Sequence, residues 1–565
     1  MKLSAVILAV MAGGALAAPA RERTFATYGD WARGTASGIE VWSPGGVSRA
    51  GRLDSVEVAD EQYVWDLCPD RDGGVLLGTG GGGRVYRHDG DSLHLVFDSP
   101  ESDILCVLQE RDGTVWAGSS PDGLVYRIGP RGTPVEEFVT GQQAVWSLAL
   151  RGGEAVVGTG PEGRLFACRS GKPPRELART AMTNVLSVLA LAGEEILAAG
   201  DAPCAVQRIG ADGSVMTVAR LDFDEIRSLT LFGPDSIGAL AMGTLASGLP
   251  GSALLAGRVS GPLSELWVCP DSLALDLTPR PEGAVVVGGW PGRVHLVKDA
   301  GAFRRLAEVS TEQLLCTAAS GSRLYLGAGS PACLYWIDEE RVTVGSWRSP
   351  VIDAGTVAQW GRIAWMGRGG DMTLKGRSGN LGDPDSEWSP WVTGNASDAA
   401  WTCLLPDARF AQFELTLRSG DGIIPVVDWL QTNYQPRNRE PSITSFNLLA
   451  RGQKPAGVVG RPPSASPSRG GDPPDDDGDR YLVWTASDPD DDPLEYTVEV
   501  SAYPTGEWIG LERAGESYRV VAQGALAEGW YRFRLTATDS PGNPPAVSRR
   551  TADVIGPHMI DDTPR

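Results

Sequence analysis

Short apolar runs separated by polar turns recur along the first 340 residues of the chain. The clearest example is residues 112–132, DGTVWAGSSPDGLVYRIGPRG, in which two apolar runs flank a turn rich in Ser, Pro and Gly. Runs of this length bounded by turn residues predict β-strands, and long stretches with the 3.6-residue spacing of a helix are absent. We therefore expect an all-β fold.

The apolar runs repeat with a nearly constant period. Strands rich in β-branched and other apolar residues begin at positions 64, 104, 145, 185, 226, 273 and 314, in steps of 40, 41, 40, 41, 47 and 41 residues. A period near 40 residues with four strands per repeat is typical of a β-propeller. The third residue of these strands is mostly small, which suits the crowded strand next to the axis: Asp66, Cys106, Ser147, Ser187, Ser228, Leu275 and Cys316.

Residues 38–53 match the second half of a repeat and stand before the first complete one. A propeller closes its ring by pairing strands from both ends of the repeat region. We therefore predict a seven-bladed propeller over residues 24–344, in which the hairpin at 38–53 completes the blade that begins at 314. Eight blades would require each partial unit to stand alone, and we favour seven.

Two motifs recur in this region, D-G-x-[VL]-W-x-G-[TS] and G-[LV]-[VL]-Y-R, and residues 112–128 match both most clearly. In these motifs the chain resembles propellers of the two-component-regulator type and the wider WD40 and YVTN-like group, over residues 38–344. The resemblance implies the fold but no single function, because propellers serve enzymes, receptors and scaffolds alike. The WD dipeptide pattern of WD40 repeats is missing, and nothing resembling a histidine-kinase domain follows.

Residues 345–436 predict a β-sandwich that loosely resembles discoidin-like jelly-roll modules. Seven tryptophans lie in this segment: Trp347, Trp360, Trp365, Trp388, Trp391, Trp401 and Trp429. We expect them to pack in the core, and a sugar-stacking site is the alternative. Residues 437–479 predict a first strand and then a flexible Pro- and Asp-rich insertion. Residues 480–565 resemble a fibronectin type III or immunoglobulin-like domain, with Trp484 in its core and Tyr531 at its strand-F tyrosine position.

The N-terminus indicates an exported protein, and the charge of the chain limits its partners. Residues 1–18 have the Lys2 charge, short apolar core and small-residue cleavage site of a signal peptide, so we expect a periplasmic or extracellular location. The formal net charge of −21 argues against nucleic-acid or membrane-surface binding. No later segment predicts membrane insertion. The eight cysteines are expected to be buried thiols, with a disulfide network as the alternative.

The turns between the second and third strands of each repeat are expected to emerge on one face of the propeller. They are short and mostly uncharged, which favours binding a protein or a glycan at the cell envelope over catalysis. No nucleophile, phosphate-loop or metalloprotease motif is present, so we assign no catalytic residue. A propeller hydrolase or lyase acting on polysaccharide or a small molecule is the alternative. The candidate ligand-face residues are Ser119, Asp122, Glu162, Asp201 and Trp290.

Two Asp clusters late in the chain are candidates for a metal: Asp475, Asp476, Asp477 and Asp479, and then Asp488, Asp490, Asp491 and Asp492. Asp488, Asp490 and Asp492 offer the hard oxygen ligands that Ca²⁺ prefers. Their spacing does not match an EF-hand, and a solvated acidic turn is the reading we favour. Apart from a structural Ca²⁺ at this turn, we expect no cofactor.

Overall fold

The computed structural model describes residues 20–561 apart from 271–272, 290, 300, 310–312, 398–399, 421–422, 456–478, 515–516, 523 and 544. The predicted signal peptide, Trp290 and most of the Pro- and Asp-rich insertion lie outside the described residues. The regular secondary structure of the described chain is nearly all strand, as expected. The exceptions are a five-residue helix, α1 (Tyr28–Ala32), and a 3₁₀ turn at Ala192–Glu194. Among the described residues, no helix is long and apolar enough to cross a membrane.

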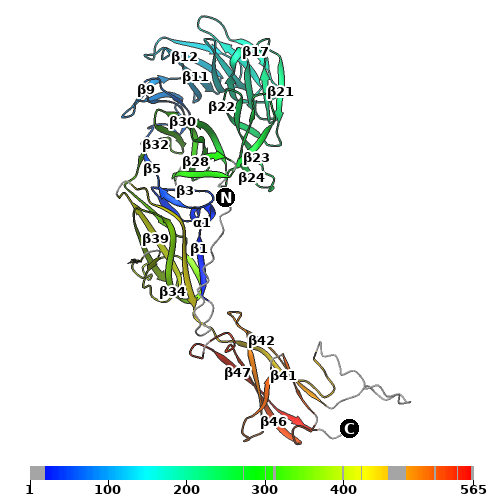
Figure 1. Ribbon diagram of the computed structural model, residues 1–565. Coiled ribbons are helices and arrows are strands. Elements are labelled where there is room, and N and C mark those ends of the chain that lie inside the picture. The colour runs from blue at the N-terminus through cyan, green and yellow to red at the C-terminus, as the bar shows by residue number, and fades with distance from the viewer. Residues whose placement is uncertain are drawn as a thin grey trace, which may run out of the picture.

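Four-stranded antiparallel units follow one another along residues 63–309 (Figure 1). Each unit is given from its innermost to its outermost strand. The first two units are β6 (Tyr63–Pro69), β7 (Val75–Gly80), β8 (Arg84–His88) and β9 (Leu93–Asp98), and then β10 (Asp103–Gln109), β11 (Val115–Ser120), β12 (Leu124–Ile128) and β13 (Val135–Val139). The next two are β14 (Ala144–Arg151), β15 (Glu154–Gly160), β16 (Arg164–Cys168) and β17 (Arg175–Arg179), and then β18 (Val185–Ala190), β19 (Ile196–Gly200), β20 (Ala205–Ile209) and β21 (Val215–Arg220). The last two are β22 (Glu225–Gly233), β23 (Ser236–Thr244), β24 (Pro250–Arg258) and β25 (Leu263–Val268), and then β26 (Ala274–Arg280), β27 (Gly283–Gly288), β28 (Gly292–Asp299) and β29 (Ala302–Val309). Each innermost strand contacts the innermost strand of the next unit, which is the arrangement of a β-propeller.

The next unit takes its outermost strand from the start of the chain. β30 (Gln313–Ser320), β31 (Arg323–Gly329) and β32 (Cys333–Arg341) pair in sequence, and β32 then pairs with β5 (Gly51–Glu57). The register joins Leu334 to Val56 and Ile337 to Leu53. The sequence predicted that the hairpin at 38–53 would pair here; of that range only residues 51–53, the start of β5, pair with β32.

Glycine fixes the turn between the second and third strands in successive units. Gly83, Gly123 and Gly163 have φ near +60°, at +62°, +59° and +60°. A Cβ at these positions would lie 1.9, 2.2 and 2.0 Å from a carbonyl oxygen of the segment leading to the next unit. Both the left-handed backbone and the close approach require glycine, which explains its recurrence in the repeats.

The segment before β5 joins the propeller to the following β-domain, residues 344–436, which we call the sandwich after its predicted fold. Helix α1 begins with a capping box between Thr27 and Asp30. Four strands around it pair with both domains. Three pair with the sandwich: β1 (Arg21–Phe25) and β4 (Val47–Arg49) with β40 (Val426–Pro436), and β2 (Thr35–Ser37) with β33 (Val344–Arg348). The fourth, β3 (Ile39–Trp42), pairs with β29 of the propeller. This segment therefore makes one continuous sheet across the junction.

The sandwich consists of β33, β34 (Ile352–Arg368), β35 (Asp371–Gly379), β36 (Val392–Thr393), β37 (Asn395–Ser397), β38 (Ala400–Thr402), β39 (Ala408–Arg418) and β40. Its core includes side chains of the N-terminal segment: Trp31 packs edge-on against Trp347 at 4.6 Å, and the Trp347 indole N–H donates to the Trp31 carbonyl at 2.9 Å. Core packing is confirmed for four of the tryptophans in this region, Trp347, Trp360, Trp388 and Trp401. None of the eight cysteines is in a disulfide, and seven are buried, as predicted.

The last domain has two sheets around one core. β41 (Ser442–Leu448), β42 (Arg480–Ser487) and β45 (Tyr518–Val521) form one sheet, and β44 (Ile509–Ala514), β43 (Glu495–Ala502), β46 (Gly529–Thr538) and β47 (Arg550–Ile560) form the other. Trp484 is buried between them. The Tyr531 hydroxyl donates to the Ala527 carbonyl at 2.9 Å, so it ties the start of β46 to the turn before it. In Figure 1 the propeller, the sandwich and this domain follow one another along a line.

Candidate functional site

Each innermost propeller strand carries a β-bulge near its start. The pairing with the second strand skips one residue between Val64 and Asp66, and it skips the equivalent residue in every other unit. A bulge leaves the extra residue unpaired and re-aims its side chain. These residues, which we call the mouth ring, are Trp65, Leu105, Trp146, Leu186, Arg227, Leu275 and Leu315.

The residue after each bulge links its unit to the next one around the axis. Asp66 accepts the Val107 N–H at 2.8 Å, and Cys316 donates to the Val64 carbonyl at 3.3 Å. Similar bonds link the other units. This set, which we call the axial belt, is Asp66, Cys106, Ser147, Ser187, Ser228, Asp276 and Cys316.

The belt differs at one position from the sequence-based expectation. Leu275 was expected there, but Asp276 occupies the position, because β26 starts at Ala274 and the bulge falls on Leu275. The apolar run at 273–279 resembles the other inner strands in either alignment, so the pattern alone left a one-residue ambiguity. The corrected register places a second carboxyl group on the axis.

Both belt carboxyl groups are in surroundings that disfavour their charge. Burial, and then the charge of Asp276, raise the pKa of Asp66 to about 7. Burial also raises the pKa of Asp276, although hydrogen bonds to it and the charge of Arg227 oppose that effect. Their side chains are partly open to the axial cavity, but water in so narrow a space solvates a carboxylate less well than bulk water does. Asp66 also accepts the Leu67 N–H at 2.9 Å, so both of its oxygens already hold backbone donors.

The mouth ring and the belt line one cavity of about 570 Å³ along the propeller axis. The mouth ring supplies four leucines, two tryptophans and one arginine. The two indoles are held in place: Trp65 Nε1 donates to Asp103 at 2.8 Å, and Trp146 Nε1 donates to Asn184 at 3.1 Å. A rigid aromatic and aliphatic rim of this kind can take an apolar group.

The turns that the sequence singled out lie on the same face as the mouth ring. The start of β10 pairs with the end of β11, since Asp103 lies opposite Ser120, so the loop between the second and third strands and the entry to the innermost strand adjoin. Ser119 is nevertheless fully buried and exchanges hydrogen bonds with Leu124. It holds the turn and does not face solvent.

The other candidates on this face have different surroundings. Asp122 is exposed, and its backbone N–H donates to Glu101 at 2.8 Å. Glu162 is also exposed and pairs with Arg164 and Arg179. Asp201 accepts the backbone and side-chain N–H groups of Asn184 at 2.9 and 2.8 Å. Trp290 lies outside the described residues.

Sequence reasoning missed the mouth ring because nothing in one strand marks a bulge. The signal was the position before the belt residue, which is Leu, Trp or Arg in each unit. Alternation of strand residues would place that side chain between blades, and only the bulge re-aims it toward the axis.

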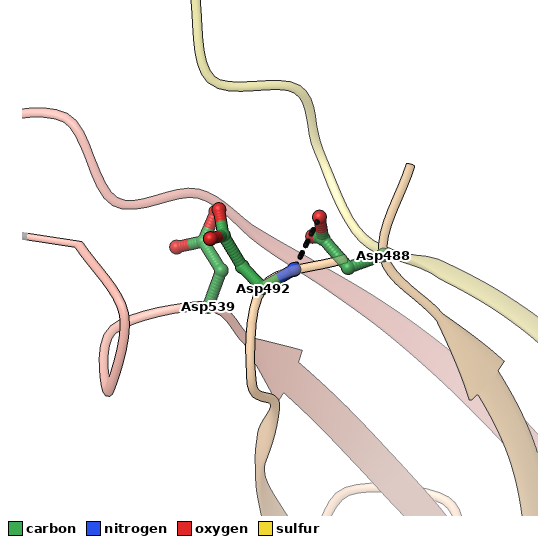
Figure 2. Close-up of side chains that lie close together, drawn as sticks. All are labelled: Asp488, Asp492 and Asp539. Carbon is green, nitrogen blue, oxygen red and sulfur yellow. Dashed lines mark hydrogen bonds between the residues drawn. The ribbon is translucent and has the colours of Figure 1, made fainter. Parts of the chain in front are cut away.

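The Asp-rich turn of the last domain is rearranged relative to the prediction. Asp488 and Asp492 lie together, but their third neighbour is Asp539, from the turn after β46, and the ligand atoms of the three lie within 4.8 Å of one another (Figure 2). Asp490 instead pairs with Arg439 at 2.8 Å. Asp539 is distant in sequence, so only the fold identifies it.

A further hollow of about 600 Å³ lies between the propeller and the sandwich. It is rich in basic side chains, Lys298, Arg304, Arg341 and Arg368. The buried Glu40 offsets part of this charge, because it pairs with Arg341 at 2.9 Å and with Arg304 at 3.8 Å.

No protein-family model matches the chain, and no curated protein matches its sequence. Among solved structures, it is similar to the WD40 β-propeller domain of Doa1, with 14% identity, a TM-score of 0.43, and coverage of 52% of this chain and 98% of that one. It is also similar to a catalytically inactive virginiamycin B lyase from Staphylococcus aureus, with 12% identity, a TM-score of 0.39, and coverage of 51% and 99%. YCF48 from Cyanidioschyzon merolae matches with 14% identity, a TM-score of 0.41, and coverage of 51% and 99%.

Proposed function

We propose that this chain is an exported, non-catalytic binding or scaffold protein that uses the mouth of its propeller to engage a protein or a glycan at the cell envelope. In this proposal the propeller has seven blades and is closed by β5. The pairing of β5 with β32 and the link from Cys316 to Val64 support that closure. The jelly-roll-like sandwich and a fibronectin type III-like last domain complete the chain; the two-sheet pairing and the Tyr531 bond support the latter.

The observation that carries the binding role is the composition of the mouth ring. Its seven side chains include no carboxyl group, imidazole, hydroxyl or thiol, and two of them are indoles already fixed by hydrogen bonds. Preorganised aromatic side chains bind with little loss of conformational entropy. Four leucines beside them favour an apolar protein side chain over a sugar, so a protein segment is the favoured ligand.

The test is binding of the full-length chain to peptide and glycan arrays, repeated with two mouth variants, Arg227→Ala and Leu105→Asp. We expect peptide ligands whose affinity falls at least about tenfold in both variants, because each removes a rim contact or adds a repelling charge. Arg111→Ala is the matched control, since Arg111 is exposed in the turn between β10 and β11, on the opposite face. Ligands that bind both mouth variants as well as wild type would refute the proposal.

A propeller hydrolase or lyase is the second candidate, and the two belt carboxyl groups are the observation that favours it. A carboxyl group with a pKa of about 7 can act as a general acid or base. Against this, Asp66 and Asp276 both accept backbone N–H groups from the next blade, so their oxygens are used in the belt. Turnover of an array glycan by wild type that is lost in Asp276→Asn would favour the enzyme.

A further inference from the structure

Three segments meet at the end of the last domain that faces the sandwich. They are the turn between β42 and β43, which carries Asp488 and Asp492; the turn between β46 and β47, which carries Asp539 and Asn543; and the linker between β40 and β41, which carries Asn438. Figure 2 shows the three carboxyl groups side by side.

Among the described residues, the three carboxylates accept hydrogen bonds from neutral amide N–H groups and not from a cationic side chain. Asp539 is fully buried and accepts the Asn438 amide and the Arg549 backbone N–H, each at 2.6 Å. Among the ion pairs of the described residues, Arg439 binds Asp490 and not the cluster. Grouped carboxylates without a cation repel one another, so this arrangement calls for positive charge.

Unpartnered oxygens around the cluster are the second and independent observation. Asp488 Oδ2, Asn543 Oδ1 and Asn438 Oδ1 are buried atoms that receive no hydrogen bond. Asn543 is only 4% exposed, and its amide lies against the cluster, with Nδ2 at 2.7 Å from Asp492 Oδ2. Half a turn of that amide would point its oxygen into the cluster. Buried acceptors without partners are rare and destabilising. A cation in the cluster would satisfy Asp488 Oδ2 directly, and it would satisfy the two amide oxygens once the amides of Asn438 and Asn543 are turned.

We propose that Asp488, Asp492, Asp539, Asn438 and Asn543 bind one Ca²⁺ ion. Carboxylate and amide oxygens are the ligands that Ca²⁺ prefers, and no thiol or imidazole takes part. Ligand oxygens on opposite sides of Ca²⁺ lie about 4.6–5.2 Å apart, which suits carboxylates that lie within 4.8 Å of one another. Mg²⁺ requires a tighter octahedron and suits this set less well.

The ion would also fix the linker. Asn438 and Arg439 lie between the end of β40 at Pro436 and the start of β41 at Ser442, and Arg439 already holds Asp490 through three hydrogen bonds. With Asn438 as a ligand, Ca²⁺ ties the linker to both turns of the last domain. The junction between the sandwich and this domain is then stiffer with the ion than without it.

The test is calcium titration of the full-length chain after removal of divalent ions with a chelator. We expect calorimetry to show one Ca²⁺ per chain, and the melting transition of the last domain to rise by about 10 °C at a hundredfold excess over the dissociation constant. Mg²⁺ should bind at least about tenfold more weakly. No heat and no melting shift at up to about 10 mM Ca²⁺, the weak end of natural sites, would overturn the proposal.

Variants locate the ion. Asp539→Asn and Asp492→Asn should each weaken Ca²⁺ binding at least about tenfold, because each removes one ligand charge. Asp553→Asn is the matched control, since Asp553 is exposed on β47 and bonds only to its neighbour Val554. If Asp539→Asn unfolds the domain, Asp492→Asn decides, because Asp492 is partly exposed. Wild-type affinity in Asp492→Asn would overturn the site, and small-angle scattering that does not change with bound Ca²⁺ would overturn its effect on the linker.

Discussion

Deletion of residues 21–60 is expected to unfold the propeller and the sandwich together. The deletion removes β5 and so exposes the edge of β32, and it removes Phe25, Trp31 and Val41 from the core of the sandwich. Loss of a buried Trp side chain alone destabilises by about 3–5 kcal/mol, and the total free energy of unfolding of a typical domain is about 5–15 kcal/mol. The remaining chain should therefore fail to fold cooperatively.

Thermal melting followed by far-UV circular dichroism measures this effect. The control is deletion of residues 441–565, which removes the last domain but no strand of the other two bodies. We expect that truncation to melt within about 2 °C of the corresponding full-length transition. A 21–60 deletion that melts as the full-length chain does would show that the N-terminal segment is not a structural part of either body.

The second large effect is a change in how stability depends on pH when Asp66 becomes Asn. The pKa of Asp66 is raised in the folded state from 3.8 to about 7, so between these pH values the folded chain holds a proton that the unfolded chain has released. The free energy of unfolding therefore falls as the pH rises from about 4 to about 7. The loss is about 2–4 kcal/mol, with the lower value applying where water in the cavity solvates the carboxylate.

Asp66→Asn removes this titration and keeps an oxygen that can accept the Val107 N–H. Denaturant unfolding at pH 4, 5.5, 7 and 8 measures the free energy of unfolding of both chains. The value for the variant should increase relative to that of wild type as the pH rises, so that the variant is the more stable chain at pH 8. The exposed turn residue Asp91 provides the control, and Asp91→Asn should follow wild type throughout. A constant difference between Asp66→Asn and wild type across this range would contradict the raised pKa.

The sequence predicts those parts of the fold that rest on local pattern. The spacing of the inner strands, near 40 residues, predicts the propeller, and turn glycines such as Gly123 mark where strands reverse. The N-terminal segment was predicted less well, because its apolar positions suit any strand. Pairing β4 with β40 joins Val47 to Val427, and no local pattern encodes a partner so distant in sequence.

The candidate sites illustrate the same limit. The sequence shows Asp488 and Asp492 as a cluster. Asp539 and Asn543 join them only because the end of β42, the start of β43 and the end of β46 lie at one edge of the domain. At the propeller mouth, the turn-like sequence around Ser119 predicted that this residue lies on the surface. Its hydroxyl instead closes the turn, as Ser and Thr side chains do when they replace backbone partners.

Cross-linking of a photoreactive form of an array-selected peptide to the full-length chain tests the proposed binding face most directly. Mass spectrometry then identifies the residues to which the peptide attaches. We predict attachment at the mouth ring, at or beside Leu105, Trp146, Arg227 and Leu315. Attachment confined to the outer strands, to the opposite face around Arg111 or to the sandwich would contradict the proposal that the propeller mouth is the binding site.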